Sequence, residues 1–344
     1  MSNSDKLSLK APINRSDFDF EQFRKEADIF PIKVYNYDKV FVTGSGICFN
    51  RFSKLLPGTY MFDTRVKRNQ QKIAFLNYLL RKKKVLDLQN IYLVIHNQWS
   101  INGYYHWLAD SAVRLWSVKS RFKEITLLLP EKAKTILFIQ GTLRLLPELK
   151  VEYLADKKVA YVNQLVVPTH LPSWGLLEPN LLKEFSDYVV NKVCTKQYPN
   201  EFIYISRKNA SRRKIVNEEN LIKSLKLLGF QIVFLEETEF SKQVKLFNKA
   251  KIVMSIHGAA LTNLVFMQQG TNVIEILKSE TESTKMIMEY HKLASVFNVN
   301  YFYIPSQLDQ EGVVDDLGNL IVDIRYVEVL LKRIIKSGQF KESN

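Results

Sequence analysis

The stretch KIVMSIHGAALTNLVFMQQGTNVIEI, residues 251–276, contains two apolar runs separated by a short helical pattern. Residues 251–257 and 271–277 have the composition of buried strands, and residues 260–270 that of a helix closed by Gly270. Nearly continuous apolar strands that alternate with helices are typical of βαβ units in a parallel sheet. The stretch therefore predicts a parallel α/β domain.

The same alternation extends on both sides of this stretch. Further strands are expected at 201–207, 230–236 and 301–305, and further helices at 217–229, 239–250 and 284–298. The first of these strands follows a turn-like segment, Gln197-Tyr198-Pro199-Asn200. We therefore expect a Rossmann-like domain over residues 199–322, followed at 323–344 by a C-terminal helix that can pack back on the first domain.

The N-terminal half is also mixed in pattern. Strands are expected at 39–44, 91–97, 125–130 and 160–168, and helices at 68–84, 104–120 and 132–146. These segments predict a second α/β domain over residues 31–198. Residues 1–30 form an N-terminal extension in which no strand is expected.

Length and composition agree with two globular domains. The chain has 344 residues, of which 46% are hydrophobic. Its two cysteines, Cys48 and Cys194, suggest neither a disulfide framework nor a zinc site. No run of about 20 apolar residues occurs and the first residues lack a signal-like apolar core. We expect a cytoplasmic protein that can lie peripherally on the inner face of the cell membrane.

The net charge of +14 is concentrated in the first half of the chain. Residues 51–150 hold 18 Lys and Arg against 6 Asp and Glu. Residues 65–84 combine an apolar helical face with eight basic residues, which predicts a surface for an acidic acceptor or for anionic lipid headgroups. The alternative is a solvated helix whose basic end complements its own C-terminal dipole.

The strand at 251–257 ends in His257, and small residues follow it. In a parallel sheet, ligands bind beyond the carboxyl ends of the strands, where helix N-termini attract anions. A phosphate site here would comprise His257, Gly258, Ala259, Ala260, Thr262 and Asn263. The alternative is tight helix packing beside an interior histidine.

A basic loop follows the strand at 201–207. Because both strands are parallel, this loop leaves the sheet at the same edge as His257. Arginine donors suit phosphate oxygens, so Arg207 together with Arg212 or Arg213 is expected at a diphosphate. Glu275, inside an apolar strand, is expected to bind ribose hydroxyls or else to form an internal ion pair. Together these residues predict a pocket for a nucleotide or a nucleotide sugar.

Residues 102–116, NGYYHWLADSAVRLW, contain the chemical side chains of the first domain. His106 and Asp110 are four residues apart and so share one face of a helix, where either could act as a base. Tyr105 and Trp107 offer flat surfaces on which a sugar or acceptor could stack. The alternative is an amphipathic helix with its aromatic residues in the core.

Four stretches give the chain a resemblance to glycosyltransferase family 61, and within it to the bacterial capsular-polysaccharide branch. They are YHWLADSAVRLW (105–116), YISRKNASRRKIVNEENL (204–221), EFSKQVKLFNKAKIVMSIHGAALTNLVFM (239–267) and TNVIEI (271–276). The resemblance implies a GT-B architecture, in which two Rossmann-like domains face each other across a cleft. It also implies an inverting, metal-independent transfer with no cofactor, from a UDP-linked sugar to a glycan of the capsule or cell surface.

The DxD motif of metal-dependent transferases occurs once, at Asp17-Phe18-Asp19, where no strand precedes it, and we interpret it as chance. A nucleic-acid-binding protein is the alternative suggested by the isoelectric point of about 9.5. It lacks a recognition motif, so no nucleic-acid partner is expected. A Rossmann dehydrogenase lacks support because the glycine fingerprint is missing. A family member that binds nucleotide without transfer stays open.

Overall fold

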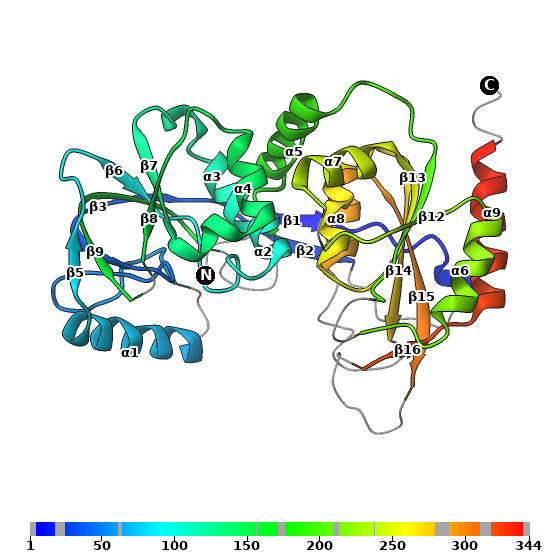
Figure 1. The fold of residues 1–344 in the computed structure, drawn as a ribbon, viewed down its shortest axis with the longest axis horizontal. Coiled ribbons are helices and arrows are strands. Elements are labelled where there is room, and N and C mark those ends of the chain that lie inside the picture. Colours follow the sequence, from blue (N-terminus) through cyan, green and yellow to red (C-terminus); the bar gives the residue numbers. More distant parts are fainter. Residues whose placement is uncertain are drawn as a thin grey trace. The chain divides into compact units, whose positions relative to one another are not determined.

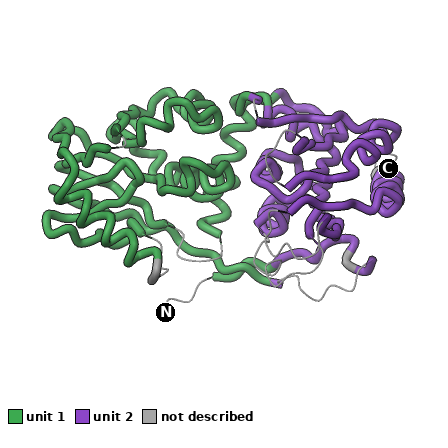
Figure 2. The backbone as a smooth tube through the Cα atoms, turned by 60° about the horizontal axis from the view of Figure 1, so that its bottom comes forward, with its two compact units in different colours: residues 1–8, 26–194, 239–242 green, residues 9–25, 195–238, 243–344 purple. Residues whose placement is uncertain are grey.

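The computed structural model describes residues 5–17, 25–60, 64–155, 157–170, 176–208, 213–236, 238–278, 289–309 and 318–339. The chain forms two compact units (Figure 2). Unit 1 comprises Met1–Ser8, Glu26–Cys194 and Glu239–Lys242, and unit 2 comprises Leu9–Lys25, Thr195–Thr238 and Gln243–Asn344. Within the described ranges, no helix is long and apolar enough to span a membrane.

Unit 2 is built on a six-stranded sheet in the order β12-β11-β13-β14-β15-β16. Its strands are β11 (Glu201–Ile205), β12 (Gln231–Val233), β13 (Ala250–Ile256), β14 (Asn272–Lys278), β15 (Asn300–Leu308) and β16 (Leu320–Ile321). The first five are parallel and β16 is antiparallel. Numbered along the chain, the parallel strands lie in the order 2-1-3-4-5 of a doubly wound α/β fold. The predicted parallel sheet is confirmed.

Helices cover both faces of this sheet (Figure 1). They are α6 (Glu218–Leu227), α7 (Phe240–Lys249), the 3-10 helix η5 (Ala259–Phe266), α8 (Glu289–Phe297) and α9 (Ile324–Gln339). Figure 1 shows α6 and α9 on one face and α7 and α8 on the other. The helix expected at 260–270 is thus a shorter 3-10 helix. The first residues of the helix expected at 284–298 lie outside the described ranges.

The C-terminal helix α9 packs in unit 2, whereas we expected that it could pack back on the first domain. Its buried side chains Val327, Leu330 and Leu331 share a core cluster with Leu221 and Leu225 of α6. These apolar residues recur at helical spacing on one face of α9. That face packs beside α6 on the sheet of unit 2 (Figure 1).

Unit 1 contains a mixed sheet in the order β4-β3-β9-β6-β7-β8, with β5 also paired to β9. Its strands are β3 (Val34–Thr43), β4 (Cys48–Phe49), β5 (Lys83–Val85), β6 (Ile91–Leu93), β7 (Ile125–Pro130), β8 (Lys150–Leu154) and β9 (Val159–Pro168). β9, β6, β7 and β8 are parallel, but β3 and β4 are antiparallel to their neighbours. This half is α/β as expected, with a sheet that is not purely parallel.

The helices of unit 1 begin with α1 (Thr64–Leu80), which the sequence placed at 68–84. It ends earlier because Lys83–Val85 leave the helix and pair with β9 as strand β5. The long helix expected at 104–120 is divided into three pieces, namely α2 (Tyr104–His106), a π-helix at Trp107–Ser111 and α3 (Ala112–Trp116). α4 (Leu137–Arg144) and α5 (Pro179–Val193) complete the set of longer helices.

The expectation that residues 1–30 contain no strand is wrong. β1 (Asp5–Ser8) pairs with β2 (Glu26–Phe30), which also pairs with β10 (Leu176–Leu177). Both N-terminal strands are short and carry charged residues, so neither shows the apolar pattern of a buried strand. Backbone pairing rather than side-chain burial defines them.

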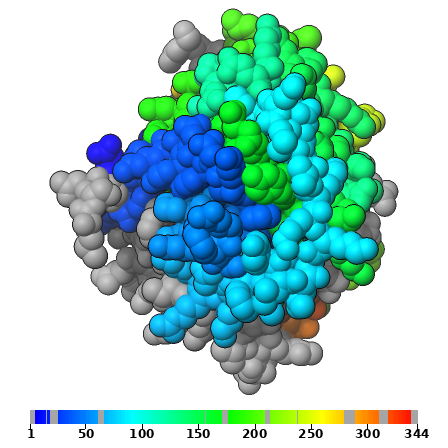
Figure 3. Space-filling model, turned by 90° about the vertical axis from the view of Figure 1, so that its left-hand side faces the viewer, coloured from blue at the N-terminus to red at the C-terminus, as the bar shows by residue number. Residues whose placement is uncertain are grey.

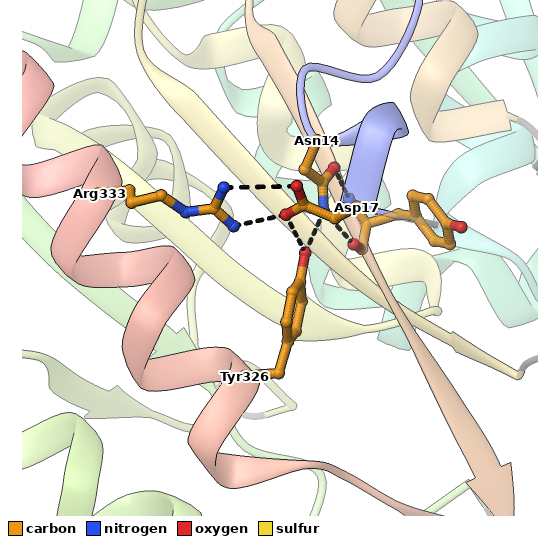
Figure 4. Close-up of polar contacts among 5 residues, drawn as sticks. Asn14, Asp17, Tyr326 and Arg333 are labelled. Carbon is orange, nitrogen blue, oxygen red and sulfur yellow. Dashed lines mark hydrogen bonds and ion pairs between the residues drawn. The ribbon is translucent and has the colours of Figure 1, made fainter. Parts of the chain in front are cut away.

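Residues 9–17 belong to unit 2, and polar contacts hold them there (Figure 4). The Asn14 side-chain amide donates to the Tyr303 carbonyl at 2.7 Å and to the Tyr326 hydroxyl at 2.9 Å. Asp17, the first residue of the Asp-Phe-Asp sequence, accepts from Arg333 at 2.5 Å and from Tyr326 at 2.9 Å. Phe18 and Asp19 lie outside the described residues. Asp17 therefore forms part of an ion pair with α9.

Candidate functional site

The neighbouring strands β11 and β13 form the topological switch point of unit 2. They are parallel, with Ile205 opposite Ser255, and the chain continues from them to strands on opposite sides. Ligands of open α/β sheets bind beyond the carboxyl ends of the strands at this position. Arg207 follows β11 and His257 follows β13, so the structure places both at this edge, as predicted.

Arg207 lies against the backbone of Gly258. A Cβ atom added to Gly258 would lie 2.8 Å from Arg207 Nη1, closer than real Cβ contacts allow. The absence of a side chain at position 258 therefore lets the guanidinium reach the start of η5. A cation beside a helix start provides a favourable place for an anion.

Arg213 approaches the same turn. Its Nη1 lies 3.5 Å from the His257 carbonyl oxygen, and its buried Nε has no hydrogen-bond partner among the described residues. Its backbone is in the left-handed region, with φ of 56°. Strained backbone of this kind clusters at functional sites. Arg212, the other arginine expected here, lies outside the described residues.

Glu275 does not have the geometry expected of a ribose-binding residue. Its side chain is 1% exposed, and Oε1 lies 2.5 Å from His257 Nδ1. Its other oxygen accepts a 2.5 Å hydrogen bond from the Tyr301 hydroxyl. Since both oxygens are engaged inside the sheet, the internal pair considered as the alternative is the arrangement found. The consequence is that Glu275 holds the His257 ring.

The first turns of η5 separate exposed residues from buried ones. Ala259 is exposed and Ala260 half-buried, whereas Thr262 and Asn263 are fully buried. Asn263 donates to Gln243 at 2.9 Å and to the Ala260 carbonyl at 3.1 Å, so its amide stabilises the turn rather than facing a ligand. Of the η5 residues expected at a phosphate, Ala259 and Ala260 are thus accessible, whereas Thr262 and Asn263 are not.

A second cluster lies beyond the carboxyl ends of β6 and β9 in unit 1. These strands are parallel neighbours; His96 and Asn97 follow β6, and His170 follows β9. Arg114 of α3 donates to the Pro168 carbonyl at 2.9 Å through Nε and to His170 Nδ1 at 3.0 Å through Nη1. It also donates to the Ile95 carbonyl. The buried guanidinium therefore ties the two strand ends together.

The ionisation states in this cluster follow from its burial. Burial lowers the pKa of Arg114 to about 10, which still leaves it charged at neutral pH. Burial also lowers the pKa of His96 to about 4 and that of His170 well below its usual value, so both rings are neutral. Arg114 is thus the cation of the cluster at neutral pH.

Asp110 is the carboxylate of this cluster and lies in the π-helical segment. Its Oδ2 accepts a 3.3 Å hydrogen bond from Asn97, whereas Oδ1 is buried with no hydrogen-bond partner among the described residues. Burial raises the pKa of Asp110 to about 6, against the opposing influence of Arg114 and Asn97. A carboxyl group with a pKa near neutrality can act as a general base.

The other residues expected around Asp110 have different roles. His106 is exposed, its ring lies near those of Trp99 and Tyr105, and its described hydrogen bonds do not include Asp110. The π-helix between the two residues changes their spacing from that of a regular helix. Tyr105 is half-buried.

Trp107 is not available for sugar stacking. It is completely buried, and its indole N–H donates to the Thr142 hydroxyl of α4 at 3.0 Å. Its ring packs near Phe138 of the same helix. The core alternative is therefore the arrangement found for Trp107, because the aromatic body fills the space between the segment and α4.

The sequence interpretation missed Asn97, Arg114 and His170. Arg114 stands one helical turn after Asp110, so the Asp-x-x-x-Arg spacing was a usable signal. Asn97 and His170 carry no local signal, because they join the cluster only through the pairing of β6 with β9. In the described part of the chain, no three His, Cys, Asp or Glu residues are grouped as a metal site requires.

Comparisons with known proteins point to one family. Residues 104–274 match the family model described as Glycosyltransferase 61. The chain is 34% identical to the Xylan glycosyltransferase MUCI21 of Arabidopsis thaliana over 73 residues. This stretch covers 20% of this chain and 15% of that protein. It is 28% identical to the EGF domain-specific O-linked N-acetylglucosamine transferase of Gallus gallus over 130 residues. This stretch covers 35% of this chain and 23% of that protein.

A third relative is the Alpha-1,3-arabinosyltransferase XAT3 of Oryza sativa subsp. japonica, with 34% identity over 68 residues, or 19% of this chain and 12% of that protein. The matched stretches thus span less than a quarter of the length of these three relatives. All three come from plants or animals. The matched region of this chain includes Asp110, Arg207 and His257.

Proposed function

Because the chain carries a glycosyltransferase family 61 region over residues 104–274, we propose that it moves a sugar from a nucleotide-sugar donor to a hydroxyl of a glycan acceptor. We assign the donor to unit 2 and the acceptor to unit 1, following the GT-B arrangement that the sequence resemblance implies. The proposal extends to a UDP-linked hexose or pentose as donor. It also extends to an acidic or lipid-linked acceptor in capsular or cell-surface polysaccharide synthesis.

The observation that carries the proposal is the contact of Arg207 with Gly258 at the switch point of unit 2. In the proposed complex, the leaving diphosphate lies against Gly258 and Ala259, with Arg207 and Arg213 neutralising its charge. Preorganised cations of this kind stabilise charge that develops on a leaving group. The transfer we propose accordingly uses no metal ion.

His257 completes the proposed donor site. When its Nδ1–H donates to Glu275 Oε1, the ring is fixed in the turn and Nε2 is the ring atom that can meet a ligand. The Tyr301 hydroxyl fixes the carboxylate in turn. We therefore propose that His257 contacts the diphosphate and that Glu275 and Tyr301 position it.

Asp110 is the proposed base. Its carboxylate takes the proton of the acceptor hydroxyl while the hydroxyl oxygen attacks the anomeric carbon from the face opposite the nucleotide. The new bond joins that carbon to the acceptor oxygen, and the bond to the diphosphate oxygen breaks, which inverts the anomeric centre. His106 is the alternative base, although its exposed ring lacks the hydrogen-bonded setting of Asp110.

Two variants test the two halves of the proposal. We expect Arg207→Ala to weaken UDP binding, measured by calorimetry, by about 10-fold or more, the scale of a charge-assisted hydrogen bond. We expect Asp110→Asn to reduce turnover by about 100-fold or more while UDP binding stays unchanged. Lys226→Gln, at an exposed position on α6, is the control for Arg207.

Each half can fail separately. Unchanged UDP affinity in Arg207→Ala would remove the phosphate role of the switch point. Near-normal turnover in Asp110→Asn would remove the base assignment. A wild-type protein that binds UDP but transfers no sugar from any of UDP-, GDP-, CMP- or dTDP-sugars would instead be a nucleotide-binding family member without transferase activity.

A further inference from the structure

Helix α1 exposes five large apolar side chains to solvent, whereas two of the three described side chains that it buries are polar. Ile73, Phe75, Leu76, Leu79 and Leu80 are 37%, 52%, 51%, 58% and 77% exposed. Of its described side chains, the helix buries Gln70, Ala74 and Asn77. An amphipathic helix on a globular protein normally buries its apolar face. In α1 this orientation is reversed.

Specific contacts hold α1 in the reversed orientation. The Gln71 amide donates to the Ser53 carbonyl at 2.6 Å, and its oxygen accepts from the Leu55 N–H at 3.3 Å. The Tyr78 ring meets the rings of Phe41 and Phe49 edge-on, at centroid distances of 5.4 and 6.3 Å. The folded unit therefore holds α1 through a face that includes Gln71, Ala74 and Tyr78, and the five exposed apolar residues lie outside that face.

Basic residues surround these apolar side chains. Lys67, Arg68 and Lys72 are exposed on α1, and Arg81–Lys84 are exposed directly after it. No Asp or Glu occurs between Asp63 and Asp87. Lys84 is paired with Glu152 at 3.1 Å, whereas Arg68, Lys72 and Lys82 are in no described ion pair with an acidic residue.

Two further apolar residues are exposed in the segment that follows the helix. Val85 and Leu88 are 63% and 52% exposed, respectively. Figure 3 faces the end of unit 1 where α1 and the segment after it, coloured blue to cyan, form much of the visible surface. We call the exposed apolar residues of α1, with Arg68, Lys72, Arg81 and Lys82, the α1 face.

We propose that the α1 face docks on an anionic lipid bilayer, with its five apolar side chains in the interface and its basic residues at the headgroups. An amphipathic helix that combines exposed Leu and Phe with Lys and Arg, and carries no acid, binds such a surface through both burial and charge. A protein partner would need an acidic rim around an apolar groove. The uninterrupted positive charge favours the bilayer, whose surface is negative throughout.

Vesicle flotation of the full chain tests this surface without using any enzymatic activity. The vesicles contain phosphatidylcholine either alone or with about 30% phosphatidylserine, an anionic lipid. We expect the protein to float with the anionic vesicles only, and less at raised salt. Leu76→Asn with Leu79→Asn should abolish flotation, since it removes two apolar side chains from the α1 face. Both residues are exposed, so the variant should fold. Lys72→Gln with Lys82→Gln should reduce flotation several-fold.

Matched controls come from unit 2. Leu227, which is 89% exposed, and the exposed Lys223 and Lys226 lie on α6. Leu227→Asn, and Lys223→Gln with Lys226→Gln, should float as the wild type does. Circular dichroism and thermal melts check that every variant is folded.

Three outcomes would overturn the proposal. The first is a wild-type protein that floats with neither vesicle. The second is unchanged flotation of the double leucine variant. The third is a dimer in light scattering that the same variant converts to a monomer, because the α1 face would then join two copies of the chain. The result does not depend on the proposed transferase activity, so either proposal can fail alone.

Discussion

Asp110 gives the reaction rate an expected dependence on pH. Its pKa is raised to about 6 because burial disfavours the charged carboxylate. Only the ionised form can take a proton, so kcat/KM should rise about tenfold per pH unit below pH 6 and level off above it. Asp110→Glu should keep part of this profile at a lower rate. A rate that does not change between pH 5 and 7 would contradict the assignment.

Glu275 gives a prediction about the orientation of His257. Glu275→Gln should preserve UDP affinity within about threefold, because an amide oxygen can still accept from Nδ1–H and its NH₂ can face Tyr301. Glu275→Leu should weaken UDP binding about tenfold, since the ring loses its partner. Calorimetry measures both affinities, and thermal melts check the fold. Equal losses in the two variants would argue against an orienting role.

At the level of elements, Gly258 at the junction of β13 with η5 makes room for the Arg207 guanidinium. Its φ of 169° is extended backbone that alanine can adopt, so Gly258→Ala should change the free energy of unfolding by less than about 1 kcal/mol. The added Cβ would instead displace the Arg207 guanidinium, and UDP binding should weaken about tenfold. Lys226→Gln, at an exposed position on α6, is the control. Unchanged UDP binding in Gly258→Ala would show that the guanidinium need not lie here.

The contact between the 3-10 helix at Arg15–Asp17 and α9 predicts a pH-dependent contribution to stability. The hydrogen bond from Arg333 holds the pKa of Asp17 below its usual value. A depressed carboxyl pKa stabilises the fold above the usual aspartate range and loses that effect as pH falls through the folded pKa. The Arg333 side chain is 53% exposed, so solvent screening keeps the effect small.

Asp17→Asn should therefore lower the free energy of unfolding at pH 7 by about 1 kcal/mol or less, and by less still at pH 3. Denaturant titration at the two pH values measures the difference. Lys336→Gln, one turn further along α9 and exposed, should have no such effect. A loss that is equal at both pH values would mean that Asp17 acts through packing rather than charge.

Strands could be predicted from the sequence where their side chains are buried. Four of the parallel strands of unit 2, β11, β13, β14 and β15, are largely buried, so their apolar runs were visible in the sequence. β5 was missed because all three of its residues are exposed and its pairing with β9 lies about 75 residues away. Local patterns carry no information about such a partner, nor about the π-helical segment at Trp107–Ser111.

At the scale of the whole molecule, the candidate site was predictable where sheet topology alone decides it. Arg207 and His257 follow parallel strands, and that rule placed them together before any side-chain geometry was known. Glu275, Asn263 and Trp107 were assigned to ligands because their neighbours in sequence were chemically suitable. Their burial and internal hydrogen bonds depend on residues from distant elements, which a local pattern cannot show.

The assignment of the donor to unit 2 predicts which backbone segments a bound nucleotide protects. If unit 2 holds the donor, UDP should slow amide hydrogen exchange at 201–208 and 255–261, because those backbone segments border the proposed diphosphate site. A ligand bound to the folded state raises the free energy of opening in the segments that it contacts. Arg207→Ala should remove this protection, and Lys226→Gln should keep it. Protection confined to residues 91–116, around Asp110, would place the nucleotide in unit 1 and reverse the proposed roles of the two units.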